Sequence, residues 1–389
     1  MKRISLLGST GSIGLQTLQV AREFPERIDI RALATGSNVE DLIRQALEFR
    51  PRAVAIADAS ALRRAKDSLR SEGIEVYGGP AGIEEMVRGV EVDTLVAAIS
   101  GFAGLRPTLA AAEAGIDIAL ANKESLVCAG QILLELVRDS GGSIVPVDSE
   151  HSALFQCLLG EERVPDRLIL TASGGPFLGR DPESLVRVTP REALAHPRWN
   201  MGQKISIDSA TMVNKGLEVI EAHWLFDVDY DHIDVIVHPQ SAIHSLVQFV
   251  DGAVKAHMGP TDMRYAIMYG LSYPERWEDP GFASFDLSKQ TFTFERPDPA
   301  LFPCLELARN AGRRGGLLPT VLVSADEIAV ESFLQGRIRF DQIATVIDRT
   351  LRTAEEAGMT GAYPEEADAI FEADAWAREN ARSSVRRLL

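Results

Sequence analysis

KRISLLGSTGSIGLQTLQV, residues 2–20, contains an apolar run, a glycine-rich turn and an amphipathic pattern in succession. Residues 2–7 predict a buried strand, and Leu15, Leu18 and Val20 predict the helix that follows. In a strand–turn–helix unit, glycines let the backbone approach a dinucleotide pyrophosphate, and the helix N-terminus supplies N–H groups and positive potential. The spacing is GxxGxxG instead of GxGxxG, so a structural turn that binds nothing is the alternative.

Strands alternate with helices through the next hundred residues, which predicts a parallel, doubly wound sheet. The expected pairs are a strand at 53–57 with a helix from Ser60, a strand at 94–99 with a helix from Leu105, and a strand at 117–121 with a helix from Glu124. Ligands bind at the carboxyl ends of strands in such sheets. Lys123 lies at one of these ends and is a candidate ligand-binding residue, although a lone lysine there is more often a solvated loop residue.

The end of the strand expected at 28–34 bears on cofactor choice. Enzymes that prefer NAD usually carry an acidic residue here, which holds the ribose 2′-hydroxyl. This chain has Gly36, Ser37 and Asn38, whose small polar groups leave space and donors for a 2′-phosphate. The pattern therefore favours NADP. Glu40 and Asp41 follow closely and weaken that inference unless they open the next helix.

Composition limits the classes of protein to consider. The 389 residues suffice for two or three domains, and 46% of them are hydrophobic, as in an ordinary globular protein. A formal charge of −16 disfavours nucleic-acid binding. Three widely spaced cysteines suggest a reducing compartment and no disulfide framework. We expect no signal peptide and no membrane span.

VPVDSEHS, residues 145–152, places two carboxylates just after an expected strand at 143–147. Side chains two apart on an extended chain share a side, so Asp148 and Glu150 are predicted to point into one site. Converging carboxylates repel unless a cation or a shared proton relieves them, and a hard divalent ion is the usual partner. The alternative is a solvated pair at a helix N-terminus, where negative charge is favoured.

Polar residues in the middle of the chain suggest an anion site and a mobile loop. Ser173-Gly174-Gly175 follows a strand expected at 167–171 and offers a hydroxyl and backbone N–H groups to an anion, or is an ordinary turn. Residues 179–205 lack periodicity and carry Trp199 among polar residues. Such a long loop predicts a lid that closes over a ligand; a surface loop whose Trp packs on the core is the alternative.

A helix expected at about 212–226 carries Asn214, Lys215 and Glu218 on one face, because their spacings are three and four. A solvated ion pair is the plain interpretation. Together with Ser209 before the helix, however, Asn214 and Lys215 would suit a phosphate, and Glu218 would be a third carboxylate for the same metal ion. A hairpin is expected across Asp251-Gly252, and helices are expected from 318 onward.

The motifs together resemble the 1-deoxy-D-xylulose 5-phosphate reductoisomerase family over nearly the whole chain. They are GSTGSIG (8–14), ANKE (121–124), VDSEHSA (147–153), ASGGPF (172–177), HPRWNMG (196–202), KISIDSATMVNKGLE (204–218) and HPQSAIHS (238–245). The resemblance implies an α/β fold of three domains, with a linker before the last. In chain order, these parts are an NADP-binding Rossmann-like domain at 1–148 with a doubly wound parallel sheet, a central α+β catalytic and dimerisation domain at 149–285 with a lid loop at 179–205, a linker at 286–311 and a C-terminal helical bundle at 312–389.

The resemblance also implies a role for individual residues. NADPH would meet Thr10, Gly11, Ser12, Ile13, Gly36, Asn38, Asn122, Glu124 and Gly202. A divalent cation, Mg²⁺ or Mn²⁺, would be held by Asp148, Glu150 and Glu218. Substrate would be bound by Lys123, Ser149, Glu150, Ser173, His196, Trp199, Ser209, Asn214, Lys215 and Glu218, of which Lys123 and His196 would also take part in catalysis with the three metal ligands.

The implied protein is a cytoplasmic homodimer. It would convert 1-deoxy-D-xylulose 5-phosphate into 2-C-methyl-D-erythritol 4-phosphate by metal-assisted rearrangement and hydride transfer from NADPH, in non-mevalonate isoprenoid precursor biosynthesis. Two other functions are weighed against it. One is an NADP-dependent dehydrogenase that acts without skeletal rearrangement, and the other is a non-catalytic NADP-sensing regulator. The regulator would not need three convergent carboxylates, and product analysis would separate the dehydrogenase, because only the reductoisomerase makes a branched polyol phosphate.

Overall fold

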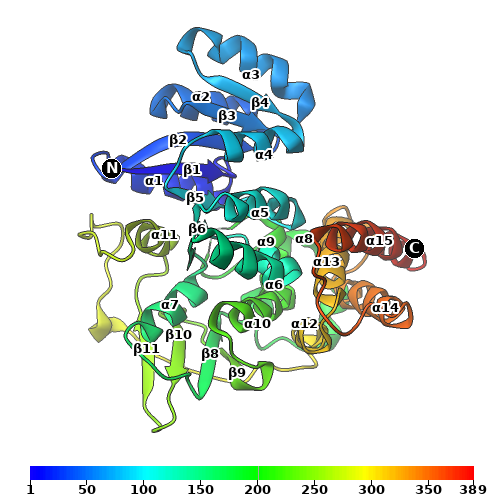
Figure 1. The fold of residues 1–389 in the computed structure, drawn as a ribbon. Helices are drawn as coiled ribbons and strands as arrows, with labels where there is room; N and C mark the ends of the chain where they lie inside the picture. Colours follow the sequence, from blue (N-terminus) through cyan, green and yellow to red (C-terminus); the bar gives the residue numbers. More distant parts are fainter. Residues whose placement is uncertain (200) are drawn as a thin grey trace. The chain divides into compact units, whose positions relative to one another are not determined.

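Within the described residues, 1–199 and 201–389, seven parallel strands form one sheet in the computed structural model (Figure 1). The order is β4-β3-β2-β1-β5-β6-β7, so strand order reverses between β1 and β5. The strands are β1 (Lys2–Leu7), β2 (Ile28–Thr35), β3 (Ala53–Ile56), β4 (Glu75–Gly78), β5 (Thr94–Ala97), β6 (Asp117–Leu120) and β7 (Ile144–Pro146). The predicted doubly wound parallel sheet is confirmed, and it contains one strand, β4, that periodicity did not identify.

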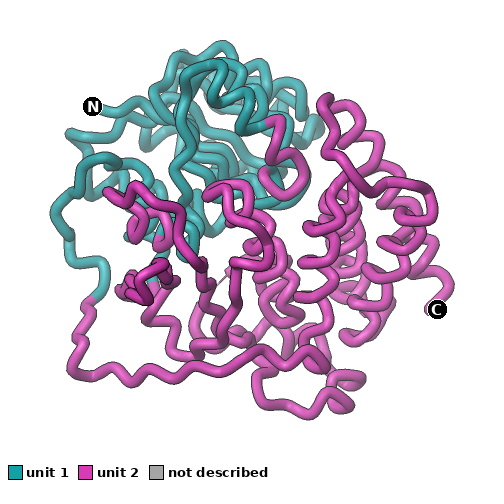
Figure 2. Tube along the Cα trace, turned by 60° about the horizontal axis from the view of Figure 1, so that its bottom comes forward, with its two compact units in different colours: residues 1–125, 133–152, 262–283 teal, residues 126–132, 153–261, 284–389 magenta. Residues whose placement is uncertain are grey.

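The chain divides into two units, drawn in different colours in Figure 2. Unit 1 comprises Met1–Ser125, Leu133–Ser152 and Asp262–Ala283. Unit 2 comprises Leu126–Ile132, Ala153–Thr261 and Ser284–Leu389. Both units are therefore discontinuous in sequence.

Helices cover the seven-stranded sheet and complete the core of unit 1. They are α1 (Ser12–Glu23), α2 (Val39–Phe49), α3 (Leu62–Leu69), α4 (Gly79–Gly89), α5 (Leu105–Glu113) and α11 (Met263–Ser272), while α6 (Lys123–Ser140) and α7 (Ser149–Leu158) belong in part to each unit. The core joins strand residues such as Leu6 and Val54 to Leu18 of α1. Ile267 and Leu271 of α11 belong to the same core, although they lie far along the chain.

Two glycines of the first turn are required by close packing of backbone. Gly8 has φ +80°, and a Cβ there would lie 2.3 Å from the carbonyl oxygen of Ala98, which follows β5. A Cβ on Gly14 would lie 2.2 Å from the carbonyl oxygen of Gly8. Real Cβ atoms do not approach backbone so closely, so the GxxGxxG spacing follows from how β1, α1 and β5 meet.

Unit 2 contains a second sheet, of four strands among the residues that the structure describes, in the order β11-β10-β8-β9. The strands are β8 (Arg167–Ala172), β9 (Ile233–Val237), β10 (Ile243–Gln248) and β11 (Val254–Met258). β8 and β9 are parallel, whereas β10 pairs antiparallel with both β8 and β11. The hairpin expected across Asp251-Gly252 is thus confirmed, with Gly252 at φ +85°.

The remaining helices of unit 2 include the C-terminal bundle. They are α8 (Pro190–Ala193), α9 (Gln203–Thr211), α10 (Val213–Phe226), α12 (Pro303–Arg314), α13 (Leu318–Leu334), α14 (Gln342–Glu356) and α15 (Ala367–Arg386). α13 packs against α12, α14 and α15. The one helix expected at 212–226 is preceded by α9, which the sequence did not predict, and α12 also begins earlier than the helices expected from 318. No helix of the described residues is long and apolar enough to cross a membrane.

Candidate active site

The predicted cofactor residues of unit 1 follow three of its strands. Thr10 to Ile13 lie in the turn between β1 and α1, Gly36 and Asn38 follow β2, and Asn122 and Glu124 follow β6. Because these strands are parallel, their carboxyl ends meet at one edge of the sheet, next to the reversal of strand order. The ninth predicted residue, Gly202, precedes α9 of unit 2.

The N-terminus of α1 is suited to an anion. Its N-cap is Gly11, which has no side chain to occupy the free N–H groups, and its first turn contains no acidic residue. Thr10 Oγ1 is 2.5 Å from Thr35 Oγ1, and the buried amide of Gln45 donates to the carbonyl of Ser9 over 3.0 Å. These contacts hold the turn to β2 and α2, so its N–H groups are presented by a rigid backbone.

The residues after β2 start a helix. Asn38 is the N-cap of α2, and its side chain accepts from the N–H of Asp41 over 3.2 Å. Glu40 and Asp41 occupy the first turn of α2, where negative charge is favourable, and Glu40 pairs with Arg64 at 2.5 Å. Glu40 and Asp41 therefore begin the next helix, which was the alternative considered for them. They do not lie at the end of β2, where a ligand of the ribose 2′-hydroxyl would be.

Asn122 joins two loops of the sheet edge. Its side-chain oxygen accepts from the N–H of Ser125 and so caps α6, while its amide donates to the carbonyls of Ile99 and Gly101 and to Glu124. Asn122 and Glu124 are both buried. The pair therefore fixes the loop after β5 against the start of α6, a structural role that the ANKE motif alone did not reveal.

Lys123 is not a solvated loop residue. It is 5% exposed, and its ammonium group forms an ion pair with Asp148. Asp148 also accepts from the N–H of Ser149, and Ser149 donates its hydroxyl to Glu150. Lys123, Asp148, Ser149 and Glu150 thus lie together in unit 1, as the candidate site requires.

The predicted backbone conformation of Asp148 and Glu150 was wrong. β7 ends at Pro146 and α7 begins at Ser149, so Asp148 and Glu150 are not two residues of one extended strand. Asp148 directly precedes α7 and Glu150 lies in its first turn, where the N–H of Ser152 already bonds the Asp148 carbonyl. The strand is shorter than its apolar run because Asp148 starts the helix, and helix N-termini favour both carboxylates.

In unit 2, Ser173 and His196 form a hydrogen-bonded pair. His196 Nδ1 accepts from the backbone N–H groups of Trp199 at 2.9 Å and Arg198 at 3.2 Å. Its proton is therefore on Nε2, which donates to Ser173 Oγ over 2.9 Å. Gly175 N–H also donates to that oxygen, over 3.1 Å. The Ser173 hydroxyl accepts twice, so its own hydrogen is directed to another acceptor, such as an anion.

Protonation of His196 is expected to disturb this arrangement only in acid. Burial lowers the pKa of His196 from 6.5 to about 4. The folded chain therefore keeps the ring neutral, and the stability that this provides is full above pH 6.5 and is lost as the pH falls toward 4. In a histidine-labelled NMR titration, the His196 ring signal, identified by its loss in His196→Asn, should have a midpoint near 4. A midpoint near 6.5 would contradict the burial of the His196 ring.

α9 and α10 meet at a sharp corner that carries the other unit 2 candidates. Met212 has φ +60°, and the N–H of Val213 donates to Thr211 Oγ1. Ser209 lies before the corner, and Asn214 and Lys215 lie just after it. The three candidate phosphate-binding residues therefore lie on the two sides of this corner, Ser209 at the end of α9 and Asn214 and Lys215 at the start of α10.

Glu218 is held by both residues that share its face of α10. Lys215 forms an ion pair with it, and the Asn214 amide donates to its other oxygen over 2.5 Å. Glu218 is fully buried and Lys215 is 4% exposed. The predicted spacing is correct, but the solvated ion pair that served as the plain interpretation is wrong. A buried carboxylate is costly unless it is paired, so a charged Glu218 has to be matched by cationic groups.

The region expected to be a lid contains helical elements. Residues 182–187 form a 3-10 helix, and α8 follows with a capping box between Thr189 and Glu192. Trp199 is half-buried. Asn200, in the middle of the HPRWNMG motif, lies outside the described residues.

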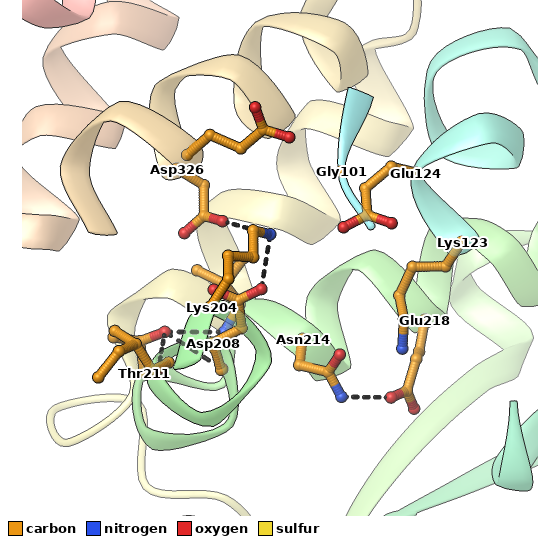
Figure 3. A network of polar contacts seen from close by, with 12 residues as sticks. Gly101, Lys123, Glu124, Lys204, Asp208, Thr211, Asn214, Glu218 and Asp326 are labelled. Carbon is orange, nitrogen blue, oxygen red and sulfur yellow. Dashed lines mark hydrogen bonds and ion pairs between the residues drawn. The ribbon is translucent and has the colours of Figure 1, made fainter. Parts of the chain in front are cut away.

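An ion-pair cluster escaped sequence analysis. Lys204 of α9 pairs with Asp208 of the same helix and with Asp326 of α13 (Figure 3). Burial, and then the charges of Asp326 and Asp208, raise the pKa of the nearby Cys304 thiol. One signal was available, because the run LPTVLVSADEIAV, residues 318–330, is largely apolar and carries charge only at Asp326 and Glu327.

Family models match most of the chain. The model for 1-deoxy-D-xylulose 5-phosphate reductoisomerase matches residues 4–130, and the model for the C-terminal domain of that enzyme matches residues 144–226. A third model, the DXP reductoisomerase C-terminal domain, matches residues 258–380. The matches follow one another without overlap along the sequence.

Curated relatives and solved structures agree with these models. The 1-deoxy-D-xylulose 5-phosphate reductoisomerase of Heliobacterium modesticaldum is 51% identical over 388 residues, covering 99% of this chain and 98% of that protein. The enzyme of Chlorobaculum tepidum is 50% identical over 387 residues, covering 99% and 100%. A crystal structure of DOX-P reductoisomerase with NADPH, fosmidomycin and magnesium has a TM-score of 0.95 at 39% identity, covering 99% and 98%. The Zymomonas mobilis enzyme with NADPH has a TM-score of 0.89 at 41% identity, covering 99% of each chain.

Proposed function

Because this chain belongs to the 1-deoxy-D-xylulose 5-phosphate reductoisomerase family, we propose a role in that reaction for each group of site residues. The protein is an NADPH-dependent reductoisomerase, which converts 1-deoxy-D-xylulose 5-phosphate into 2-C-methyl-D-erythritol 4-phosphate in isoprenoid precursor biosynthesis. The observation that carries the assignment of roles is that Asp148 and Glu218 are each paired with a buried lysine, in a chain related to the family over its whole length.

The turn between β1 and α1 would hold the NADPH pyrophosphate. A glycine N-cap and an acid-free first turn leave backbone N–H groups and positive potential for the phosphates, which fits the cofactor. Thr10, Gly11, Ser12 and Ile13 would line this contact. The adenosine side would meet Gly36 and Asn38, and the nicotinamide side would meet Asn122, Glu124 and Gly202. Bound NADPH supplies the hydride.

Asp148, Glu150 and Glu218 would hold Mg²⁺ or Mn²⁺. The chemistry of the donor set fits, because hard divalent cations prefer carboxylate oxygens and these acids can form a metal-binding group. When bound, the cation polarises the substrate carbonyl and orients the neighbouring hydroxyl groups. The proposal requires Glu218 of unit 2 to bind the same ion as the two carboxylates of unit 1.

Ser173, Ser209, Asn214 and Lys215 would anchor the substrate phosphate. Ser173 has a hydroxyl hydrogen directed away from its two donors, and Lys215 supplies a buried positive charge. Binding energy gained at the phosphate, remote from the reacting carbons, can be used to orient the substrate in the transition state. Ser149 would contact the substrate beside the metal ligands.

Lys123 and His196 would act near the reacting atoms. Lys123 brings a buried positive charge next to Asp148, where it would stabilise negative charge that develops on substrate oxygen. His196 positions Ser173 and, through its Nδ1, the backbone at Trp199. Trp199 and the rest of residues 179–205 would close over the substrate and exclude water from a reactive intermediate.

The function is tested by NADPH consumption. The full-length protein with 1-deoxy-D-xylulose 5-phosphate and Mg²⁺ should oxidise NADPH and form a branched polyol phosphate, and chelation of the metal should stop the reaction. NADPH oxidation with an unbranched product would favour a simple dehydrogenase. NADPH binding without oxidation would favour a regulator.

The cofactor site is expected to prefer NADPH over NADH. The residues after β2 bear no acid that would repel a 2′-phosphate, since Glu40 and Asp41 belong to the first turn of α2 and Glu40 is paired with Arg64. We expect kcat/KM with NADPH to exceed that with NADH by on the order of a hundredfold, comparable to the loss of one charge-assisted contact of about 3 kcal/mol. Equal values for the two cofactors would contradict this assignment.

We propose that the protein is a homodimer. β11 lies at the edge of the unit 2 sheet and exposes Val254 and Met258. An edge strand with exposed apolar side chains is a natural surface for another copy of the chain. Light scattering should give twice the 42.4 kDa of one chain.

The division of labour along the chain is also a proposal. Residues 1–148 would bind the cofactor, residues 149–285 would carry the catalytic, substrate and dimer contacts, residues 286–311 would connect, and residues 312–389 would form the bundle. A cytoplasmic location is supported by Cys128, Cys157 and Cys304, which are all buried thiols.

A further inference from the structure

The cluster of Lys204, Asp208 and Asp326 is buried more deeply than an ordinary surface ion pair. Lys204 Nζ is 2.6 Å from Asp208 Oδ2 and 2.9 Å from Asp326 Oδ2. Asp326 is fully buried in the middle of α13, and Asp208 is 2% exposed. Carboxylates in the interior are strongly destabilising unless a cation matches them. Lys204 therefore has to stay between the two helices for the cluster to be tolerated.

The position of Lys204 is not explained by helix formation alone. It lies in the first turn of α9, where the helix dipole disfavours a cation. A lysine four residues before an aspartate is also the weaker order for a pair within one helix. Asp326 is the partner from outside the helix, so the contact that makes this placement favourable is the one between α9 and α13 (Figure 3).

α9 is fixed from two further directions. Gly175 has φ +65°, and a Cβ there would lie 2.9 Å from the carbonyl oxygen of Ser209, so the turn after β8 packs directly on the α9 backbone. At its C-terminal end, the Thr211 hydroxyl contacts the backbone on both sides of the corner with α10. Both contacts lie in the C-terminal half of α9, so Asp326 holds the N-terminal half through Lys204, and a tilt of that half would turn Ser209 relative to Ser173 and Asn214.

We propose that the Lys204–Asp326 ion pair is a positioning device that sets α9 so that Ser209 binds the substrate phosphate. The inference rests on the proposed function, in which Ser209 is a phosphate ligand. It gives the C-terminal bundle a part in substrate binding, through α13, although none of its residues is proposed to touch the substrate. Lys204 and Asp326 are positioning residues in this scheme.

The test is the steady-state kinetics of Asp326→Asn in the full-length enzyme. Asparagine keeps the shape of the side chain but removes the charge that holds Lys204. We expect KM for 1-deoxy-D-xylulose 5-phosphate to rise about tenfold, with kcat within about twofold of wild type and KM for NADPH unchanged, because phosphate binding is weakened equally in the ground state and the transition state. If this variant does not fold, Lys204→Met releases the same contact from the α9 side.

Asp374→Asn is the matched control. Asp374 of α15 pairs with Arg378 at 2.7 Å and accepts from Ser324 of α13 at 2.7 Å, so it is another partly buried ion pair of the bundle. It should lower the melting temperature without changing KM. The double variant Lys204→Met/Asp326→Asn should raise KM no more than the larger single effect.

Three outcomes would overturn the inference. They are a wild-type KM in Asp326→Asn or its substitute, an equal rise of KM in Asp374→Asn, and multiplied effects in the double variant, which would mean that Lys204 binds a ligand itself. Wild-type protein that fails to turn over the substrate would instead overturn the proposed function, so the two failures are distinguishable.

Discussion

Glu218→Gln is expected to lower kcat by on the order of a thousandfold or more, the loss typical when one preorganised electrostatic group is removed from an active site. Glutamine keeps the size of the side chain, and its one oxygen can still accept from Lys215 while its NH2 group donates to the Asn214 amide oxygen once that amide turns over, so the buried face of α10 should stay packed. What it loses is a charged oxygen for the divalent cation. The Mg²⁺ concentration that gives half of the maximal residual rate should rise.

NADPH affinity should be nearly unchanged in Glu218→Gln, because the proposed pyrophosphate contact lies in the turn after β1. Isothermal titration with NADPH measures this directly. Glu161→Gln is the control, since Glu161 pairs with Lys255 at the surface of unit 2 and should keep the wild-type kcat. If Glu218→Gln lost both NADPH binding and turnover, the variant would be misfolded or the site would be arranged differently from this proposal.

Gly14→Ala should destabilise unit 1 and weaken NADPH binding together. The added Cβ would lie 2.2 Å from the Gly8 carbonyl oxygen and 2.6 Å from the Ser9 backbone. These are backbone atoms, which cannot rotate away as a flexible side chain could, so α1 has to move. We expect a loss of about 3 kcal/mol in unfolding free energy, at the upper end of overpacking effects. NADPH should bind on the order of a hundredfold more weakly, because the phosphate-binding N–H groups move with α1.

Gly36→Ala is the stability control for this prediction. A Cβ on Gly36 would have no heavy atom within 4 Å, so the unfolding free energy should change by less than about 0.5 kcal/mol. Chemical denaturation of both variants gives the comparison. A Gly14→Ala protein as stable as wild type, with the same NADPH affinity, would show that the turn is not restricted by close backbone packing.

The parallel sheet could be predicted because its signals are local. β1 is an apolar run ended by a glycine turn, and Asn38 with Glu40 and Asp41 form a helix start. β4 was missed because Glu75–Gly78 is a half-exposed strand with little apolar character. α9 was missed because Gly202 offers no side-chain cap and Met212, in a left-handed conformation, separates it from α10 without a glycine or proline to mark the break.

The residues of the candidate site were found mainly from motifs. Their burial and their ion-pair partners could not be predicted from the sequence. Sequence spacing placed Lys215 and Glu218 on one helix face, but only the fold shows that this face is buried. The same holds for Lys123, whose partner Asp148 lies 25 residues further on. Burial and long-range pairing depend on which elements pack together, and neither composition nor periodicity carries that information for a single polar residue.

The place of α11 has a consequence for how the protein is made. Ile267 and Leu271 complete the core of unit 1, although most of that unit is encoded in the first 152 residues. A ribosome releases the N-terminal strands long before these two side chains emerge. During that interval the nascent sheet keeps exposed the apolar surface that α11 will cover, so a chaperone that shields it should raise the yield. A truncated chain that stops before Met263 should aggregate.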